Sequence, residues 1–567
     1  MKKNLIFATI LLLFSISLTA HAQNQLSMGM ALLGKKDCAG SLPYLLRAFK
    51  EDPKSEKVNL ALGDAYRCVG NLDSAAFFYQ RTVNIEKETA PAYYGLGVIS
   101  VKQKKYADAI DDFNLAINYD SKSIKYVLAL GDAYLHTDSL DNANQAFYKA
   151  RDMDENSAQA LAGIGDVYAK QNIYDAAITN YKDALALDST NIEIRLKLAN
   201  TYMKTGKGKE AYDQFADVSR MAPNNSEGQY QAGELLYANK LYDEALPFLE
   251  KYHKLVPDDY KTVLQIGESA LNAGKYDVAV KYYKEYIAKY PNSLGAEKQL
   301  ASAYYFAKQP AESYNIFKTI PPDSLDVKDL VRFGLAANLT GDTAATVKAW
   351  THAVTTDTSL HVIENQLAGL LFSMKKYDQA IFYFKKYIAA VPTDYAAALN
   401  MGLCYVASLN YADAIAALRN VTLQKPDMYL AWRWLALAYA AADSMPQAAS
   451  AYQQVMNLGE RDTTTGADHS GDLNEANRYL GYSHMMDGIK LRKNSPDQAK
   501  NEFNDSFQYL MKALKYDKND IKTHIFLAED YAFLGKIDQA CKEIKVILRT
   551  DPKNSPMLQL QKALGCQ

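Results

Sequence analysis

Five cysteines and eight histidines are the side chains of this 567-residue chain with the greatest capacity for covalent or metal chemistry. The histidines are scattered, and His352 and His361 stand on either side of an expected helix boundary rather than at a metal-ligand spacing. The sequence contains no His-Glu-x-x-His motif, phosphate-binding glycine loop, Cys-x-x-Cys motif or nucleophile elbow. We therefore predict that the chain is not an enzyme and has no catalytic residue, metal or cofactor.

The charge balance argues against two classes of partner. The chain has 63 Lys and Arg residues against 65 Asp and Glu residues, a formal net charge of −2, and no basic block. Nucleic acids and anionic membranes attract proteins with concentrated positive charge. We therefore expect a protein or peptide partner and no nucleic acid.

The first 22 residues have the features of an export signal. Lys2 and Lys3 precede an apolar run over residues 5–18, and residues 20–22 have the small-x-small pattern of a cleavage site. We expect cleavage after Ala22 and a periplasmic or secreted mature chain without a transmembrane segment. An uncleaved anchor is the alternative, although the apolar run is short for a membrane span.

A period of 34 residues runs through the remaining sequence. It predicts a solenoid of about fifteen repeats, because each repeat of this kind buries its apolar face only against its neighbours. Small residues mark the period at Gly29, Gly63, Gly97, Gly131, Gly165, Ala199, Gly233, Gly267 and Ala301, then after one step of 33 at Gly334, Ala368, Gly402 and Ala436, and less regularly at Gly481 and Ala528.

Each repeat has the pattern of two amphipathic helices. Around Gly131, the side chains of Leu130 and Tyr134 share one helical face, and Ala143 and Phe147 form the facing stripe of a second helix. Small residues allow two helices to approach closely, and the aromatic residue fills the adjacent layer.

These positions resemble the motif of the tetratricopeptide repeat family. The motif is represented by Gly131, Tyr134, Ala143 and Phe147, with a closing proline in neighbouring repeats, and the resemblance covers essentially the whole mature chain. It implies an all-α fold, a right-handed superhelical solenoid of about fifteen antiparallel helix pairs. It also implies a concave groove, lined by the first helices, that binds a peptide or protein segment.

The repeat phase indicates which residues face this groove. Acidic residues follow the small residue in the first half of the chain, and aromatic residues occupy other groove phases. The predicted binding groove consists of Tyr94, Asp132, Asp166, Tyr230, Glu234, Tyr237, Glu268, Tyr305, Phe372 and Arg433. The alternative is that the acids only solvate the first helices or form intrahelical pairs, such as Asp64 with Arg67 and Asp166 with Lys170.

Four of the five cysteines lie in the end repeats. Cys38 near the start of a second helix and Cys68 near the end of the next first helix fall at the same edge of the solenoid. We predict a Cys38–Cys68 disulfide and, by the same reasoning, a Cys541–Cys566 disulfide. The alternative is that all five cysteines are buried thiols, as we expect for Cys404.

The expected organisation has five parts. A signal peptide at 1–22 precedes a tandem array of about thirteen repeats at 23–459, a polar insertion at 460–475, two further repeats at 476–554 and a C-terminal capping helix at 555–567. The repeat around Gly481 departs from the usual spacing.

Three functions are compatible with this pattern. The favoured one is a non-enzymatic scaffold of the bacterial envelope that binds a protein segment in its groove. The alternatives are a structural subunit of an envelope or secretion complex that uses convex and end surfaces, and a glycan-binding protein.

Overall fold

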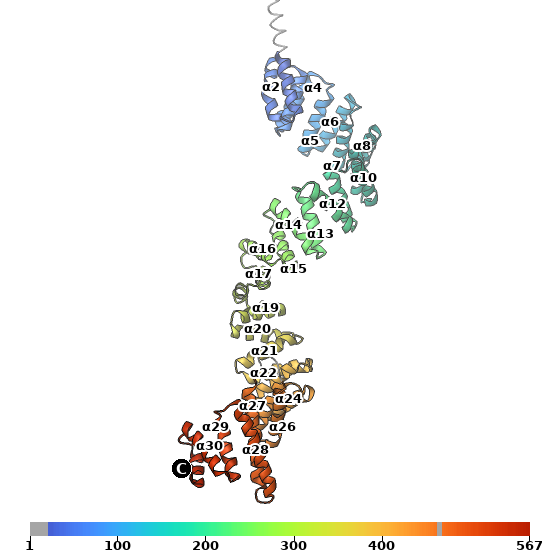
Figure 1. The fold of residues 1–567 in the computed structure, drawn as a ribbon. Coiled ribbons are helices and arrows are strands. Elements are labelled where there is room, and N and C mark those ends of the chain that lie inside the picture. The colour runs from blue at the N-terminus through green and yellow to red at the C-terminus, as the bar shows by residue number, and fades with distance from the viewer. Residues whose placement is uncertain (1–20, 462–467, 567) are drawn as a thin grey trace, which may run out of the picture. The chain divides into compact units, whose positions relative to one another are not determined.

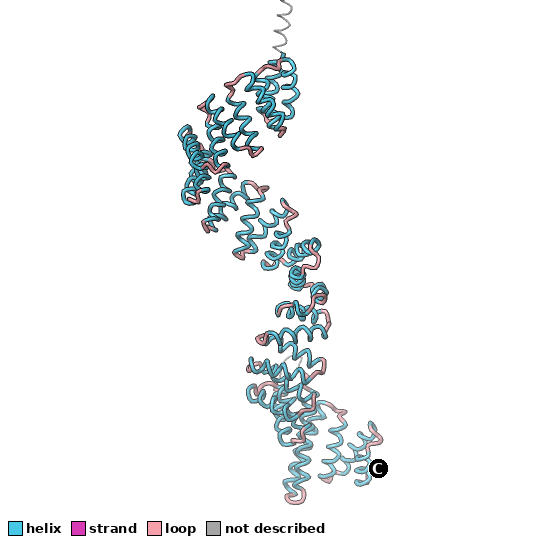
Figure 2. The backbone as a smooth tube through the Cα atoms, turned by 180° about the vertical axis from the view of Figure 1, so that it is seen from behind, coloured by secondary structure: helices cyan, strands magenta, loops and turns pink. Residues whose placement is uncertain are grey.

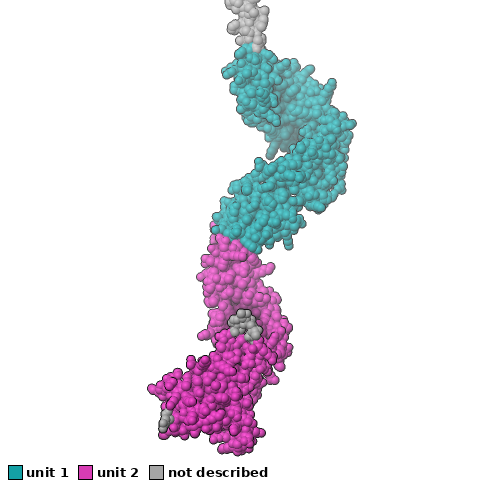
Figure 3. Space-filling view, viewed as in Figure 1, with its two compact units in different colours: residues 1–289 teal, residues 290–567 magenta. Residues whose placement is uncertain are grey.

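The computed structural model describes residues 21–461 and 468–566, and this part of the chain contains helices and no strand. Contacts divide the chain into two compact units, Met1–Lys289 and Tyr290–Gln567 (Figure 3). In both units short loops join successive helices (Figure 2). The expected all-α fold of helix pairs is therefore confirmed.

The described residues of unit one form eight helix pairs (Figure 1). The first helix of the first pair covers 21–34, and its partner is α2 (Cys38–Glu51). The others, first helix before second, are α3 (Glu56–Cys68) and α4 (Leu72–Ile85), α5 (Ala90–Lys102) and α6 (Tyr106–Tyr119), α7 (Ile124–His136) and α8 (Leu140–Met153), α9 (Ala158–Lys170) and α10 (Tyr174–Leu187), α11 (Ile192–Lys204) and α12 (Gly208–Met221), α13 (Ser226–Ala238) and α14 (Tyr242–Leu255), and α15 (Tyr260–Asn272) and α16 (Tyr276–Lys289).

A residue with a left-handed backbone follows most first helices. The φ angles of Lys104, Asp138 and Asn172 are 60°, 52° and 62°, and glycine takes the same place in other repeats, as at Gly206 and Gly274. This conformation ends a helix and reverses the chain within a few residues. The second helix can therefore fold back directly on the first.

Glycines and an aromatic ring form the contact between neighbouring repeats. The ring of Phe147 on α8 lies between Gly131 on α7 and Gly163 on α9. A methyl group added at these glycines would lie 2.7 Å and 2.3 Å from atoms of this ring. The small residues thus provide the space that the ring occupies, as the sequence pattern indicates.

Unit two contains seven helix pairs and a terminal helix within its described residues. The pairs are α17 (Leu294–Phe306) and α18 (Pro310–Phe317), α19 (Val327–Leu339) and α20 (Thr343–Thr356), α21 (His361–Ser373) and α22 (Tyr377–Ala390), α23 (Tyr395–Ala407) and α24 (Tyr411–Gln424), α25 (Tyr429–Ala441) and α26 (Met445–Gly459), α27 (Ser470–Leu491) and α28 (Pro496–Tyr516), and α29 (Ile521–Phe533) and α30 (Ile537–Thr550), followed by α31 (Ser555–Leu564).

Two pairs of unit two depart from the regular lengths. Helix α18 has only 8 residues and is followed by the 3-10 helix η1 (Pro322–Ser324), whereas the next second helix, α20, has 14. Helices α27 and α28 have 22 and 21 residues, which exceeds the 13 and 14 of α21 and α22. The irregular spacing around Gly481 thus corresponds to a lengthened hairpin.

The structure changes the expected boundaries at one place. Of the predicted insertion at 460–475, residues 462–467 lie outside the described residues, and residues 470–475 belong to α27. Most of the predicted signal peptide, residues 1–20, also lies outside the described part. Among the described helices, none is both long enough and apolar enough to cross a membrane.

Two disulfides join cysteines in the end repeats. Cys38 on α2 is bonded to Cys68 on α3, and Cys541 on α30 is bonded to Cys566 after α31. The Cα atoms are 5.9 Å and 5.5 Å apart. These are the two pairs that the repeat phase predicts. Cys404 is a buried free thiol.

The glycine–ring contact predicts opposite outcomes for two glycine substitutions. Gly163→Ala places a methyl group against Phe147, and we expect a loss of about 1–3 kcal/mol in the free energy of unfolding. Gly369→Ala on the exposed face of α21 meets open space, so we expect no loss and a gain of up to about 1 kcal/mol. Thermal unfolding followed by circular dichroism measures both, and an equal effect of the two substitutions would contradict the packing argument.

The disulfides predict a thiol count. In denaturant without reductant we expect one reactive thiol, Cys404, and after reduction all five cysteines. In the chain-entropy model, opening either disulfide removes roughly 3–4 kcal/mol from the stability of its end repeats. Five thiols in the unreduced protein, purified from an oxidising compartment, would contradict this assignment.

Candidate functional site

The first helices of unit one enclose two adjoining cavities. A cavity of about 420 Å³ lies on α5, α7, α9 and α11, and a second of about 530 Å³ involves the same four helices. Both are lined by Asp132, Asp166, Glu193 and Lys197, so they form one continuous surface. We call the lining of these two cavities the first-helix groove.

Asp166 of the predicted groove, and Asp64 at the equivalent position of an earlier repeat, accept hydrogen bonds from buried tyrosines of the second helices. The hydroxyl of Tyr181 donates to Asp166 Oδ1 at 2.7 Å, and that of Tyr79 donates to Asp64 Oδ1 at 2.7 Å. The tyrosine stands fifteen positions after the acid in both repeats. Each ring packs beside the glycine column, and its hydroxyl reaches the acid on the first helix.

Asp132 lacks this partner because the residue fifteen positions later is Phe147. No hydrogen bond or ion pair joins Asp132 to another described side chain, although it lines both cavities. Water reaches Asp132, but the helices around it displace much of its hydration, which raises the pKa of its carboxyl to about 6. The positive charge of Lys197 opposes this rise, whereas the negative charges of Asp166 and Glu193 add to it.

A lysine of the neighbouring repeat crosses the groove. Lys197 on α11 donates to Asp166 Oδ2 at 2.9 Å and lies 3.0 Å from Glu193. Lys170 does not pair with Asp166 and instead donates to Asp138. The alternative of an Asp166–Lys170 intrahelical pair is therefore wrong.

The Asp64–Arg67 pair of the same alternative is present. A nitrogen of Arg67 lies 3.4 Å from Asp64 Oδ1. The aromatic residue predicted for this end of the groove, Tyr94, lines the smaller cavity, and Lys125 Nζ lies 4.0 Å from the centroid of its ring. Of the ten predicted groove residues, Tyr94, Asp132 and Asp166 thus line one site.

The next predicted groove residues form a separate, internally bonded network on α13 and α15. Tyr237 donates to Glu268 at 2.7 Å, and Gln265 donates to Glu234 at 2.6 Å. The hydroxyl of Tyr230 accepts a hydrogen bond from Lys261 at 3.0 Å. These side chains already have partners in the protein, so a ligand would have to displace them.

The predicted groove residues of unit two also have partners. Tyr305 packs against the cluster around Tyr314, and Phe372 packs against the core of unit two. Arg433 pairs with Asp472 at the start of α27 and lies 5.0 Å from the ring centroid of Trp434. The repeat phase of Tyr305, Phe372 and Arg433 therefore did not identify side chains that are free to contact a ligand.

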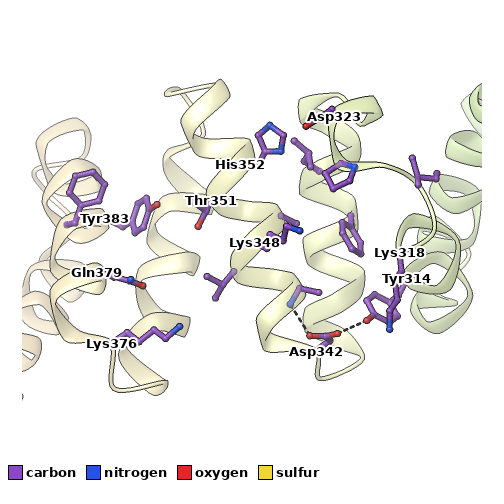
Figure 4. Close-up of a pocket in the computed structure, with 18 of the residues that line it drawn as sticks. Tyr314, Lys318, Asp323, Asp342, Lys348, Thr351, His352, Lys376, Gln379 and Tyr383 are labelled. Carbon is purple, nitrogen blue, oxygen red and sulfur yellow. Dashed lines mark hydrogen bonds between the residues drawn. The ribbon is translucent and has the colours of Figure 1, made fainter.

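A larger cavity, of about 1210 Å³, lies in unit two where the sequence analysis placed no site. Lys318 after α18, Lys348 on α20 and Gln379 on α22 border it (Figure 4). The cavity arises because α18 ends early and Pro322, in the turn that follows, lines one wall. The adjacent prolines and the single 33-residue step were the sequence signals that could have located it.

Replacement of Asp132 by asparagine, its neutral isostere, should change the stability of the protein in a pH-dependent way. The folded chain holds the Asp132 proton up to a pKa of about 6, whereas an unfolded aspartate has a pKa of about 3.9. Stability therefore falls as the pH rises through this window, because the folded state binds more protons than the unfolded state. We expect Asp132→Asn to be more stable than the parent at pH 7, with the difference disappearing near pH 4.

Circular dichroism melting curves between these pH values measure the effect. Asp183→Asn, at an exposed position of α10, is the control and should show no such trend. A stability difference that is the same at both ends of the range would contradict the role assigned to the Asp132 carboxyl.

Comparisons with known proteins match these repeats at five segments. Models of the tetratricopeptide repeat match residues 90–123, 165–206, 196–260, 262–293 and 371–433. A curated relative, protein O-mannosyl-transferase Tmtc3 of Drosophila melanogaster, is 26% identical over 104 residues. That match spans 18% of this chain and only 11% of the relative's length.

Solved structures of repeat proteins are also similar. A thermophilic TPR protein of Thermus thermophilus is 23% identical, with a TM-score of 0.29 over 32% of this chain and 99% of that one. The C-terminal part of a TPR repeat-containing protein of Cytophaga hutchinsonii is 20% identical, with a TM-score of 0.33 over 47% of this chain and 99% of that one. The models that match the five segments identify the chain as a member of the tetratricopeptide repeat family.

Proposed function

We propose that this protein is a non-enzymatic scaffold that binds an extended segment of a partner protein in the first-helix groove of unit one. The observation that carries the proposal is Asp132, a groove acid that lines both cavities while its counterparts Asp64 and Asp166 accept tyrosine hydroxyls. A donor group of the partner gives Asp132 the hydrogen bond that Phe147 cannot supply.

The other groove residues suit the same kind of ligand. Tyr94 provides an aromatic surface, and Lys197 and Lys125 provide donors for backbone carbonyls or an acidic side chain of the partner. A groove with both charges and an aromatic surface fits a polar extended peptide.

We further propose that the protein acts outside the cytoplasm, as part of the bacterial envelope or as a secreted protein. The proposal rests on the leader pattern of residues 1–22 and on the two disulfides, because such bonds persist mainly in oxidising compartments. N-terminal sequencing of protein from the envelope fraction tests the leader, and a first residue other than Gln23 would contradict cleavage after Ala22.

The relative named a transferase does not alter the proposal of a non-enzymatic role. Its match covers 104 residues, which is only 11% of the relative's length. We therefore assign no transferase activity to this chain.

A second candidate function is a structural subunit of an envelope or secretion complex. The cavity of unit two favours it, because residues from the second helices α20 and α22 line that cavity and the first-helix groove does not include them. In this case partner contacts would persist when the first-helix groove is neutralised.

Site-specific crosslinking in the native envelope separates the two functions. A photoreactive residue at Gln159, an exposed position that lines the smaller cavity, should capture a partner protein. In a background of Asp132→Lys we expect about tenfold less crosslinked product or a larger loss, since each tenfold change in affinity corresponds to ~1.4 kcal/mol.

Asp111→Lys on the second helix α6 is the matched charge reversal and should leave capture unchanged. Equal helical content of the two variants, measured by circular dichroism, excludes unfolding as the cause. Undiminished capture in the Asp132→Lys background would reject the groove proposal and favour the structural subunit.

A further inference from the structure

The lengthened hairpin of unit two brings a histidine of one helix together with two carboxylates of the other. His484 lies on α27, and Glu502 and Asp505 lie on α28. Their three potential ligand atoms, one from each residue, all lie within 4.8 Å of one another. Glu502 and Asp505 are three positions apart and thus share a face of α28, which packs against α27.

The histidine ring is held in position by both of its neighbours. His484 Nδ1 lies 2.7 Å from Glu502 Oε2, and the ring stacks on Tyr509 with a centroid distance of 5.4 Å and an interplanar angle of 9°. His484 and Glu502 are half-buried, whereas Asp505 is exposed. The group is therefore partly ordered before any ligand binds and remains accessible from solvent.

Histidine–glutamate pairs alone are common in this chain and do not identify a metal site. His253 pairs with Glu285, His361 with Glu364 and His524 with Glu543. Among the described residues, the group around His484 is the only one in which three histidine, cysteine or carboxylate ligands converge. The second carboxylate, Asp505, distinguishes it.

We propose that His484, Glu502 and Asp505 bind a divalent transition-metal ion, with Zn²⁺ as the best fit. Zinc accepts imidazole nitrogen and carboxylate oxygen at about 2.0–2.2 Å and is satisfied by three protein ligands and one water. Calcium and magnesium prefer oxygen ligands alone, so the imidazole selects against them.

Metal binding needs only small movements within the group. For Nδ1 to bind the ion, the ring hydrogen of His484 must lie on Nε2, and Glu502 must turn from the ring toward the ion. The ion then ties α27 to α28, because its ligands come from both helices. Since the hairpin contains the extra turns of this repeat, the ion stiffens a part of unit two that regular repeats lack.

The test uses the whole mature protein, freed of metal by a chelator and titrated with Zn²⁺ by isothermal titration calorimetry. We expect the parent to bind one more zinc equivalent than His484→Ala or Asp505→Asn does, or to bind it about tenfold to a hundredfold more tightly. Asp497→Asn, an exposed carboxylate in the first turn of the same helix, is the matched control and should bind as the parent does.

Two further readouts separate metal ligation from a structural effect. The apo forms of parent and Asp505→Asn should melt at the same temperature, and zinc should raise the melting temperature of the parent only. Cobalt in place of zinc should give the visible absorption of a four-coordinate site in the parent and lose it in His484→Ala. Zinc binding that is unchanged in Asp505→Asn, absent in the parent, or abolished by millimolar calcium would overturn the proposal.

Discussion

The close contact between glycines and an aromatic ring is the constraint on which the solenoid depends. Phe147 occupies the space between Gly131 and Gly163, and Tyr79 lies in the same way between Gly63 and Gly95. Only residues without a side chain allow the ring to approach both first helices this closely. In these repeats the contact sets the register between neighbours, and with it the positions of the groove side chains on α5, α7 and α9.

The type of aromatic ring in this contact also determines whether the groove acid beside it is available to a ligand. Where the ring is Tyr79 or Tyr181, its hydroxyl bonds to the acid of the first helix, whereas the hydroxyl of Tyr283 makes no such bond with Glu268. Where it is Phe147, Asp132 receives no such bond. One oxygen atom in the packing layer therefore separates an acid with a structural partner from one that is available to a ligand, because the carboxylate of Asp132 is exposed and has no donor among the described side chains.

Irregular helix lengths produce the other features of the molecule. Helix α18 is short because Pro321 and Pro322 prevent it from continuing, and a cavity borders the place where it ends. Helices α27 and α28 are long and bring His484 against Glu502. In both cases a local change in one repeat creates a surface that the regular repeats do not have.

The sequence by itself determined the helix pairs, the glycine and aromatic columns, and the pairs of cysteines that the structure joins, because a strict period places equivalent residues in equivalent surroundings. It could not determine that Glu234 would bond to Gln265, that Arg433 would pair with Asp472, or that Asp166 would choose Lys197 over Lys170. These partnerships join different repeats, and they depend on side-chain reach and direction across the interface. Only the tertiary structure decided them, since the repeat phase specifies which face a residue occupies but not which neighbour meets it there.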